Sequence, residues 1–401
     1  MQPLTAQQIL AKLVAFDTTS AGSNIALIEW VEEYLKSYGA HSERVHETNE
    51  QGVKKSALLV RIGPNVEGGI VLSGHTDVVP VIGQEWHGGK GEDTAFALNA
   101  RDGKLYARGA ADMKGFIATA LAQVPMWATQ HLKRPVWLAL SYDEEIGCKC
   151  AEPMAIEFTK HTIHPQLIMV GEPTMMQVVD EHKGIDSFET VITGKAGHSS
   201  APDAGTNAAY IAAHLTLAIE TMNAEQRAKA DAHSAFPTPY STVHVGIVTA
   251  GTARNIIPDH ASIRWEMRPM PGVNVDEIIA HFHAKVEELK TRYPGCSIVT
   301  QRLAHVHGLK KQAADAPYLT LATHLAGSNV APSAVSYGTE GGAYGKHGFP
   351  TVICGPGDIA QAHGPDEFIA IEQLEKAVAM MQRVGDVLTN ERWLGAQQAA
   401  L

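Results

Sequence analysis

Up to residue 181 the chain alternates between short runs of β-forming residues and stretches in which apolar residues recur at helical spacing. Strands that alternate with helices in this order form a mainly parallel sheet with helices on both faces. The sequence therefore predicts an α/β fold. The β-type runs lie at residues 55–62, 69–73, 135–142 and 166–170, and the helical stretches lie at 4–16, 24–38 and 108–128.

The alternation is interrupted after residue 181. The next segment combines strands of alternating polarity with two long helical stretches, which predicts an inserted α+β domain with an antiparallel sheet. We therefore expect one domain formed by residues 1–181 and 308–401, and a second domain formed by residues 182–307. The apolar faces of its helices would allow this inserted domain to pair with another subunit. Its helices are expected at 207–230 and 275–292, and the first pattern resumes with a helix at 318–325, a strand at 351–354 and a helix at 371–388.

Length and charge narrow the class of protein. A chain of 401 residues is long for a single core, which agrees with two domains. Its net charge of -11 argues against a nucleic-acid-binding surface, because phosphate binding requires a basic one. No apolar run is long enough to span a membrane, and the first residues lack the basic and apolar regions of a signal peptide. We therefore expect a cytoplasmic protein that binds neither nucleic acid nor a membrane.

A histidine and an aspartate, His75 and Asp77, follow directly on the β-type run at 69–73. Residues two apart at a strand end point to the same side, and ligands of parallel sheets bind beyond the carboxyl ends of the strands. His75 would then be a metal ligand, and the Asp77 carboxylate would fix the tautomer of its ring. The competing interpretation is a surface pair without a ligand, which is the commoner meaning of an isolated His-x-Asp.

Further acidic residues, Asp112, Glu145 and Glu172, lie at the ends of β-type runs or shortly after them. An acid in such a place is usually a helix cap or part of a solvated turn, and Asp112 alone could cap the helix that follows it. Together with His75, the three acids favour a shared metal site at one edge of the sheet. His363, after a turn rich in glycine and proline, would supply a second imidazole.

Two divalent ions that act on one carbonyl group need separate ligand sets and one bridging carboxylate. Asp112 is the expected bridge, because its neighbours have short side chains. Glu144 and Glu145 point in different directions at a strand end, so one can bind metal while the other acts as a general base. A solvated acidic turn is the alternative for this pair. Nitrogen and oxygen ligands without thiolate suit Zn²⁺, with Co²⁺ or Mn²⁺ as alternatives.

Several segments, in order, resemble motifs of the M20 metallopeptidases and deacylases, and the resemblance covers nearly the whole chain. The segments are 73–80, 109–115, 143–147, 171–174 and 197–200. The resemblance implies two metal ions per subunit and a glutamate that acts as the base. It implies His75, Asp112 and Glu172 on one ion, Asp112, Glu145 and His363 on the other, Glu144 as the base, and Asp77 as the residue that orients His75.

The resemblance also implies that residues 182–307 form a lid and dimerisation domain. His198 is similar to a histidine that, in dimeric members, reaches into the partner's site and stabilises the oxyanion. A surface histidine in a Gly/Ser loop is the alternative. Arg268 is a candidate clamp for a substrate carboxylate, with Arg254 as a weaker rival and a salt-bridged arginine as the alternative. Further substrate contacts are expected from Asn255, Gly338, Thr339 and Glu340, the last of them to a cationic side chain.

Within the family, glutamate at position 172 is typical of deacylases and aminoacylases more than of di- and tripeptidases. The expected reaction is therefore metal-dependent hydrolysis of the amide bond of an N-acyl amino acid. Residues 337–340 and 355–368 resemble the corresponding segments of the family members that act on N²-acetyl-L-ornithine. This resemblance implies N²-acetyl-L-ornithine as the substrate. The alternatives are succinyl-diaminopimelate or another acyl substrate, a dipeptide, and a non-catalytic descendant that binds metal or ligand. Cys148, Cys150 and residues 341–344 depart from the expected pattern, which indicates a different side-chain pocket.

Overall fold

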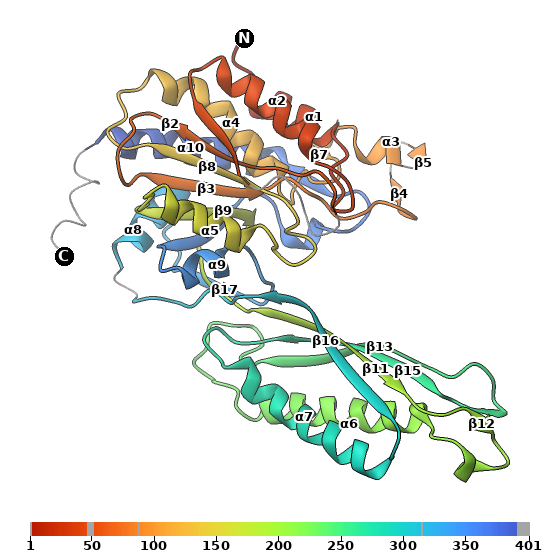
Figure 1. The fold of residues 1–401 in the computed structure, drawn as a ribbon. Coiled ribbons are helices and arrows are strands. Elements are labelled where there is room, and N and C mark those ends of the chain that lie inside the picture. Colours follow the sequence, from red (N-terminus) through yellow and green to blue (C-terminus); the bar gives the residue numbers. More distant parts are fainter. Residues whose placement is uncertain (1, 46–51, 87–88, 91, 314–315, 391–401) are drawn as a thin grey trace. The chain divides into compact units, whose positions relative to one another are not determined.

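The computed structural model describes residues 2–45, 52–86, 89–90, 92–313 and 316–390 (Figure 1). Contacts divide the chain into two compact units. The first unit consists of Met1–Glu181, Lys311–Ser333 and Thr339–Leu401, and the second consists of His182–Lys310 and Ala334–Gly338. The first unit thus contains the alternating β/α segments, and the second contains the segment that interrupts them.

Among the described residues, an eight-stranded mixed sheet dominates the first unit. Its four middle strands are parallel to one another, and the strand next to them on each side is antiparallel to the middle strand with which it pairs. The predicted mainly parallel α/β sheet is therefore confirmed. The strand order is β1 (His41–Val45), β2 (Ala57–Ile62), β8 (Val136–Ser141), β3 (Ile70–His75), β9 (Leu167–Pro173), β18 (Thr351–Gly355), β10 (Val179–His182) and β17 (Ser333–Val335).

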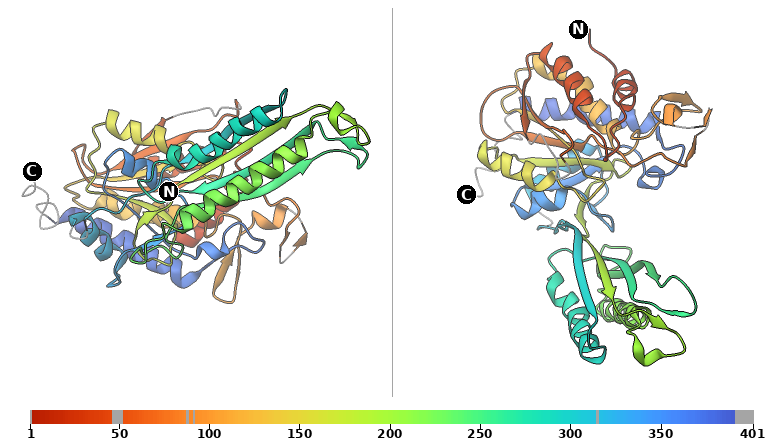
Figure 2. Two further views of the ribbon diagram at one scale, coloured as in Figure 1. Left: turned by 90° about the horizontal axis from the view of Figure 1, so that it is seen from below. Right: turned by 45° about the vertical axis from the view of Figure 1, so that its right-hand side comes forward.

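Helices cover both faces of this sheet (Figures 1 and 2). Five of them share one apolar core with the strands: α1 (Ala6–Val14), α2 (Ile25–Lys36), α4 (Lys114–Thr129), α8 (Pro317–Ala326) and α10 (Ile371–Thr389). On the other face, α5 (Ala151–Lys160) and α9 (Gly341–Lys346) pack together. The rings of Phe158 and Tyr344 stack between these two helices, with centroids 5.4 Å apart.

The parallel strands bring the candidate ligands to one edge of the sheet. Strand β3 ends at His75, β8 ends just before the acidic residues 143–145, and Glu172 lies near the end of β9. All residues of β3 and β9 are buried, as expected for strands that are covered on both faces. Because the carboxyl ends of parallel strands meet at one edge, residues about 70 to 100 positions apart in the sequence become neighbours.

Strands β6 (Asn99–Arg101) and β7 (Lys104–Tyr106) form a hairpin around Asp102 and Gly103. Both turn residues have positive φ angles, which a tight two-residue hairpin turn requires. Strand β19 (Phe368–Ala370) pairs with β7, so the chain after His363 returns to the segment that leads into Asp112. Further short elements are β4 (Glu85–Trp86), β5 (Gly89–Lys90), α3 (Glu92–Ala95) and the 3-10 helix η2 (Ile359–Gln361).

The second unit is an antiparallel sheet covered on one face by two helices (Figure 2). Residues of β11 alternate between buried and partly exposed, which confirms the period-2 pattern expected for this segment. Asn207 and Asn274 cap the two helices by accepting main-chain N–H groups. Among the helices of the described residues, none is both long and apolar enough to cross a bilayer. The sheet order is β13 (Thr242–Ala250), β15 (His260–Arg268), β11 (Ile185–Thr193) and β16 (Ser297–Val306). The two helices are α6 (Ala208–Arg227) and α7 (Val275–Arg292). The 3-10 helix η1 (Pro202–Ala204) lies beside a small ladder of β12 (Gly197–His198) and β14 (Ile256–Ile257).

Candidate functional site

His75 is the fully buried centre of the cluster at the strand ends. Its Nε2 atom lies 3.0 Å from Asp112 Oδ1 and 3.8 Å from Glu172 Oε1. Its Nδ1 atom lies 2.9 Å from the main-chain carbonyl oxygen of Asp77. Because a carbonyl oxygen only accepts hydrogen bonds, Nδ1 carries a proton. In the neutral ring the lone pair is therefore on Nε2, the nitrogen that faces the carboxylates.

Asp112 lies between the two histidines of the cluster, in the loop that precedes α4. Its Oδ1 atom faces His75, and its Oδ2 atom lies 3.3 Å from His363 Nε2. The same nitrogen of His363 lies 3.0 Å from Glu145 Oε2. His363 has a φ of 64°, in the left-handed region that costs a non-glycine residue about 1–3 kcal/mol. One carboxylate thus contacts both imidazoles, which is the arrangement expected of a bridging ligand.

Glu172 is held where β9 passes very close to α4. A Cβ atom on Gly171 would lie 2.0 Å from the ring of Phe116, so only glycine fits before Glu172. The Glu172 side chain is buried, and its Oε1 atom has no hydrogen-bond partner in the described part of the chain. A buried carboxylate oxygen without a partner is costly, and a bound cation would supply the missing interaction.

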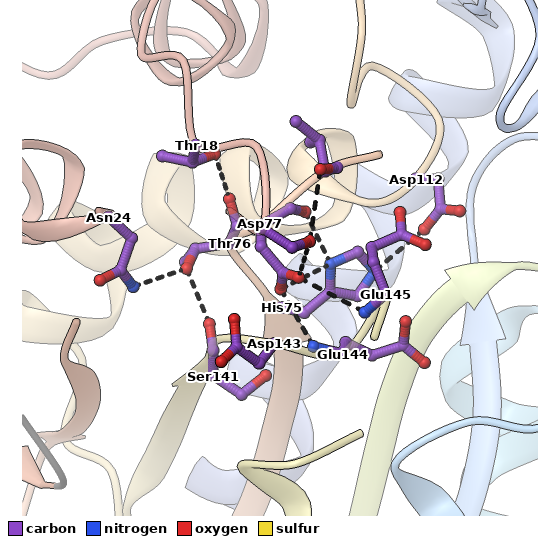
Figure 3. Close-up of polar contacts among 12 residues, drawn as sticks. Thr18, Asn24, His75, Thr76, Asp77, Asp112, Ser141, Asp143, Glu144 and Glu145 are labelled. Carbon is purple, nitrogen blue, oxygen red and sulfur yellow. Dashed lines mark hydrogen bonds and ion pairs between the residues drawn. The ribbon is translucent and has the colours of Figure 1, made fainter. Parts of the chain in front are cut away.

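Two overlapping groups of side chains are spaced for a metal ion. The ligand atoms of His75, Asp112 and Glu145 lie within 4.8 Å of one another, and so do those of His75, Glu144 and Glu172. Figure 3 shows the carboxylates of Glu144, Glu145 and Asp112 on the same side of His75. The second group makes Glu144 a possible ligand, in contrast to its predicted role as a base. Metal content of a Glu144 variant distinguishes these two roles.

The profile of the peptidase family M20/M25/M40 matches residues 71–385, which is most of the chain. The chain belongs to this family. A relative from Myxococcus xanthus, named acetylornithine deacetylase, is 33% identical over 93% of this chain and 95% of its own length. Another acetylornithine deacetylase, from Pasteurella multocida, is 32% identical over 94% of this chain and 96% of its own length.

Solved structures share the same M20 fold. A tripeptidase from Staphylococcus aureus has a TM-score of 0.75 and 18% identity, and the match covers 97% of this chain and 99% of that protein. A dinuclear metal-binding M20 peptidase from Bacillus subtilis has a TM-score of 0.66 and 16% identity, with 96% and 97% covered. The predicted M20 resemblance is therefore confirmed, and the chain is a hydrolase of a metal-dependent family.

The cluster of histidines and carboxylates around Asp112 has the electrostatic properties of a cation site. Burial, and then the charge of Asp112, raises the pKa of Glu172 well above its ordinary value, and burial is also the main reason why the pKa of Glu144 is raised to about 8. Hydrogen bonds to Asp112 and Glu145 raise the pKa of His363 to about 10. Without a metal ion, Glu144 and His363 therefore hold protons at neutral pH. Metal ligands are ionised carboxylates and neutral imidazoles, so divalent cations would replace these protons. With the unpartnered oxygen of Glu172, this donor set fits a metal centre.

Asp77 holds the main chain of the segment that carries Glu144 and Glu145 (Figure 3). Its Oδ1 atom accepts the main-chain N–H of Glu144 at 3.2 Å, and its Oδ2 atom accepts that of Glu145 at 3.4 Å. Ser20 donates a further hydrogen bond to Oδ2 at 2.7 Å. The nearest carboxylate oxygen of Asp77 is 3.6 Å from His75 Nδ1, farther than the carbonyl oxygen of the same residue. The carboxylate of Asp77 is occupied by the main-chain N–H groups of Glu144 and Glu145. Asp77 therefore orients the His75 ring chiefly through its own carbonyl oxygen.

A buried ion pair between Lys55 and Asp143 supports the same segment. Lys55 Nζ also donates to the main-chain oxygen of Ser20. Neither Lys55 nor Ser20 is among the residues predicted from the sequence. A lysine at the start of an apolar β-type run is a signal for a buried pair, because lysine is rarely fully buried without a partner. The sequence does not identify that partner, which lies 88 residues away.

Cys148, one of the residues that depart from the expected pattern, contacts the predicted base directly. Its Sγ atom lies 3.1 Å from Glu144 Oε1. Burial and the charges of Glu144 and Glu340 raise the pKa of the Cys148 thiol well above its ordinary value. The thiol is therefore protonated and donates to the carboxylate, which leaves Oε2 of Glu144 for other contacts.

In the second unit, His198 is exposed on β12, and Ser200 fixes the orientation of its ring. The main-chain N–H of Ser200 donates to His198 Nδ1 at 3.2 Å. The neutral ring therefore carries its proton on Nε2. The main-chain oxygen of Asn255 accepts the N–H of Ser199 at 3.1 Å, so the predicted substrate residue Asn255 lies beside the predicted oxyanion donor.

The other residues predicted to contact substrate have protein partners. Arg268 donates from Nε to Glu266 Oε1 at 3.1 Å, so its guanidinium is in a salt bridge. Thr339 is buried, and its hydroxyl oxygen accepts the N–H of Gly341. Glu340 is fully buried, and Ser73 lies 3.4 Å from its Oε2 atom. A Cβ atom on Gly338 would lie 2.9 Å from Ile185 Cγ1. Roles of these residues in substrate binding stay predictions.

Proposed function

We propose that the chain hydrolyses the amide bond of an N-acyl amino acid with the aid of two divalent metal ions, and that the substrate is N²-acetyl-L-ornithine. The products would be L-ornithine and acetate, as in arginine biosynthesis. The observation that carries amide hydrolysis is the convergence of two histidines and two further carboxylates around Asp112, with Glu144 beside them. The choice of substrate is supported by relatives named acetylornithine deacetylase that match nearly the whole chain.

The five ligand side chains would hold the ions: His75, Asp112 and Glu172 one of them, and Asp112, Glu145 and His363 the other. Zn²⁺ suits this set of nitrogen and oxygen donors, with Co²⁺ or Mn²⁺ as alternatives. When bound, such ions polarise a carbonyl group and lower the pKa of water. Asp112 is suited to contact both ions because its two carboxylate oxygens face different histidines.

Glu144 is assigned the proton transfers. Cys148 donates to Oε1, so we assign the transferred proton to Oε2. This oxygen accepts a proton from the attacking water and returns it to the leaving amine nitrogen, so that the carboxylate is regenerated in each cycle. Asp77 fixes the main chain at Glu144 and thereby sets the position of the base.

The substrate assignment predicts a ranking of activities. With Zn²⁺ or Co²⁺ supplied, kcat/KM for N²-acetyl-L-ornithine is expected to exceed that for N-succinyl-diaminopimelate and for dipeptides by about tenfold or more, which corresponds to ~1.4 kcal/mol in the transition state. Mass spectrometry of the products measures this ranking. Preferred cleavage of a dipeptide would make the protein a peptidase. A protein that binds metal but cleaves nothing in the panel would be a non-catalytic descendant.

We also propose that two copies pair through the second unit and that His198 stabilises the oxyanion in the partner's site. Support for pairing comes from β13, an edge strand with exposed Ile247 and Val248, since unpaired edges are templates for another chain. The proton on Nε2 of His198 provides the hydrogen-bond donor that an oxyanion requires.

A mixture of two inactive variants tests this assignment. Glu144→Ala and His198→Ala subunits, unfolded together and refolded as mixed dimers, are expected to recover roughly a quarter of wild-type activity. Half of the dimers would be mixed, and one of their two sites would have both intact residues. Each variant refolded alone is the control. No recovery, despite mixed dimers shown by native mass spectrometry, would place His198 in its own subunit's site. Full activity of His198→Ala refolded alone would place it outside the reaction.

A further inference from the structure

Glu367 lies four residues after His363, and its buried carboxylate binds the loop that carries Asp112. Its Oε1 atom accepts the main-chain N–H groups of Ala111 at 2.9 Å and of Asp112 at 3.0 Å. Its Oε2 atom accepts the N–H of Gly109 at 3.1 Å. One side chain from the His363 segment thus satisfies three main-chain donors of the Asp112 loop.

Arg108 makes the reciprocal connection. Its Nη1 atom donates to Glu367 Oε2 at 2.7 Å, and its Nη2 atom lies 3.3 Å from the main-chain oxygen of His363. Gln84 accepts from Nη2 at 2.7 Å and itself donates to the same oxygen of His363 at 2.9 Å. The side chain of Arg108 is 1% exposed, and its guanidinium lies over the ring of Trp86. A side chain from the Asp112 loop thus holds the main chain of His363.

Stability alone does not account for this pair. A buried ion pair is often no more stabilising than apolar residues of the same volume, because both charges lose their hydration. The pair does provide four charge-assisted hydrogen bonds to two loops that lack regular secondary structure over these residues. One of these loops contains His363 in its left-handed conformation, which persists only where the surroundings hold it.

We propose that Arg108 and Glu367 are positioning residues that keep Asp112 and His363 at the separation the second metal ion requires. Asp112 Oδ2 and His363 Nε2 face each other, and each of their loops is hydrogen-bonded to the charged residue of the other loop. The inference rests on the proposed metal centre. It assigns neither residue a contact with metal or substrate.

The test is metal binding by Glu367→Gln. Glutamine keeps the volume of the side chain, but its NH₂ group would face either a main-chain N–H donor or the guanidinium of Arg108. At least one of the four hydrogen bonds that Glu367 accepts is then lost. We expect the affinity for the second equivalent of Co²⁺ to fall about 10–100-fold, the usual effect of removing a residue that supports a ligand. Titration of metal-free protein, followed by the visible absorption of Co²⁺, measures both the affinity and the ligand geometry. The spectrum of the second equivalent is expected to change.

Asp186→Asn is the matched control, because Asp186 is a fully buried carboxylate of the second unit, paired with Arg302 and His305. It is expected to lower the melting temperature without changing Co²⁺ affinity or spectrum. Arg108→Lys is the second positioning variant, since one ammonium group cannot reproduce the planar contacts to Glu367 and His363. Arg108→Lys is expected to lower the affinity for the second equivalent of Co²⁺, as Glu367→Gln does. It serves as the test if Glu367→Gln fails to fold.

The results separate this inference from the proposed function. If the wild-type chain binds two ions and both positioning variants bind them with unchanged affinity and spectrum, the positioning role is wrong and the metal centre stands. If the wild-type chain binds no Co²⁺ or Zn²⁺, the proposed metal centre fails, and the positioning role fails with it.

Discussion

Replacement of Glu144 by glutamine or alanine is expected to lower kcat about 10²–10⁴-fold, the range for loss of a general base, while zinc content stays near that of the wild type. Glu144 is the carboxylate of the cluster whose Oε1 is engaged by Cys148. Its main-chain N–H is held by Asp77, so its backbone position should survive the change of side chain. Steady-state kinetics and elemental analysis of the same samples provide both measurements.

The zinc content decides between the two roles that the geometry of Glu144 allows. Its carboxylate forms a ligand-spaced group with His75 and Glu172. If Glu144 is a ligand, the variants would lose zinc together with activity, and the assignment of the base would be wrong. Glu172→Gln is the comparison, since Glu172 is proposed as a ligand and its removal is expected to lower zinc content.

Replacement of Asp112 by alanine is expected to have the largest effect on metal binding. Its two oxygens face His75 and His363, so the substitution removes one donor from each proposed ligand set. Zinc content is expected to fall to about one ion per chain or fewer, with loss of measurable turnover, because two-ion chemistry needs the bridging carboxylate. Inductively coupled plasma mass spectrometry after dialysis measures the content.

Asp77→Asn is the control for Asp112→Ala. Asp77 contacts the cluster through its carbonyl oxygen and through the amides of Glu144 and Glu145, and it is not a proposed ligand. Removal of such a supporting group typically weakens metal binding about 10–100-fold, less than the loss of a ligand. His75→Ala removes a proposed ligand, as Asp112→Ala does. Both variants should therefore lose more zinc than Asp77→Asn. Retention of two ions by Asp112→Ala, or equal losses from His75→Ala and Asp77→Asn, would contradict these roles.

Much of the fold could be predicted, because its elements are set by local patterns. Helix α7 covers 275–292, the range predicted from apolar spacing, and strand β8 lies within the β-type run predicted at 135–142. The positions of the candidate ligands at strand ends were predictable for a related reason. A β-type run that leads into His75 or Glu145 fixes where the residue lies along its strand, and parallel pairing makes neighbours of those ends.

Elements without a local pattern were missed. Strand β17 has three residues and α9 has six, lengths at which periodicity does not distinguish one structure from another. The segment Ala334–Gly338 belongs to the second unit although it follows the resumed β/α pattern, and this assignment depends on contacts that composition does not reveal.

The sequence by itself determined the order of strands and helices, the inserted segment and the identities of the candidate ligands, because each depends on residues close together in the chain. The tertiary structure decided which atoms meet. It showed that His75 is oriented by a carbonyl oxygen, that Lys55 supports the glutamate segment, and that Glu367 holds the Asp112 loop from 255 residues away. Such contacts are made by folding distant segments together, and no pattern in the sequence encodes the distance between two side chains.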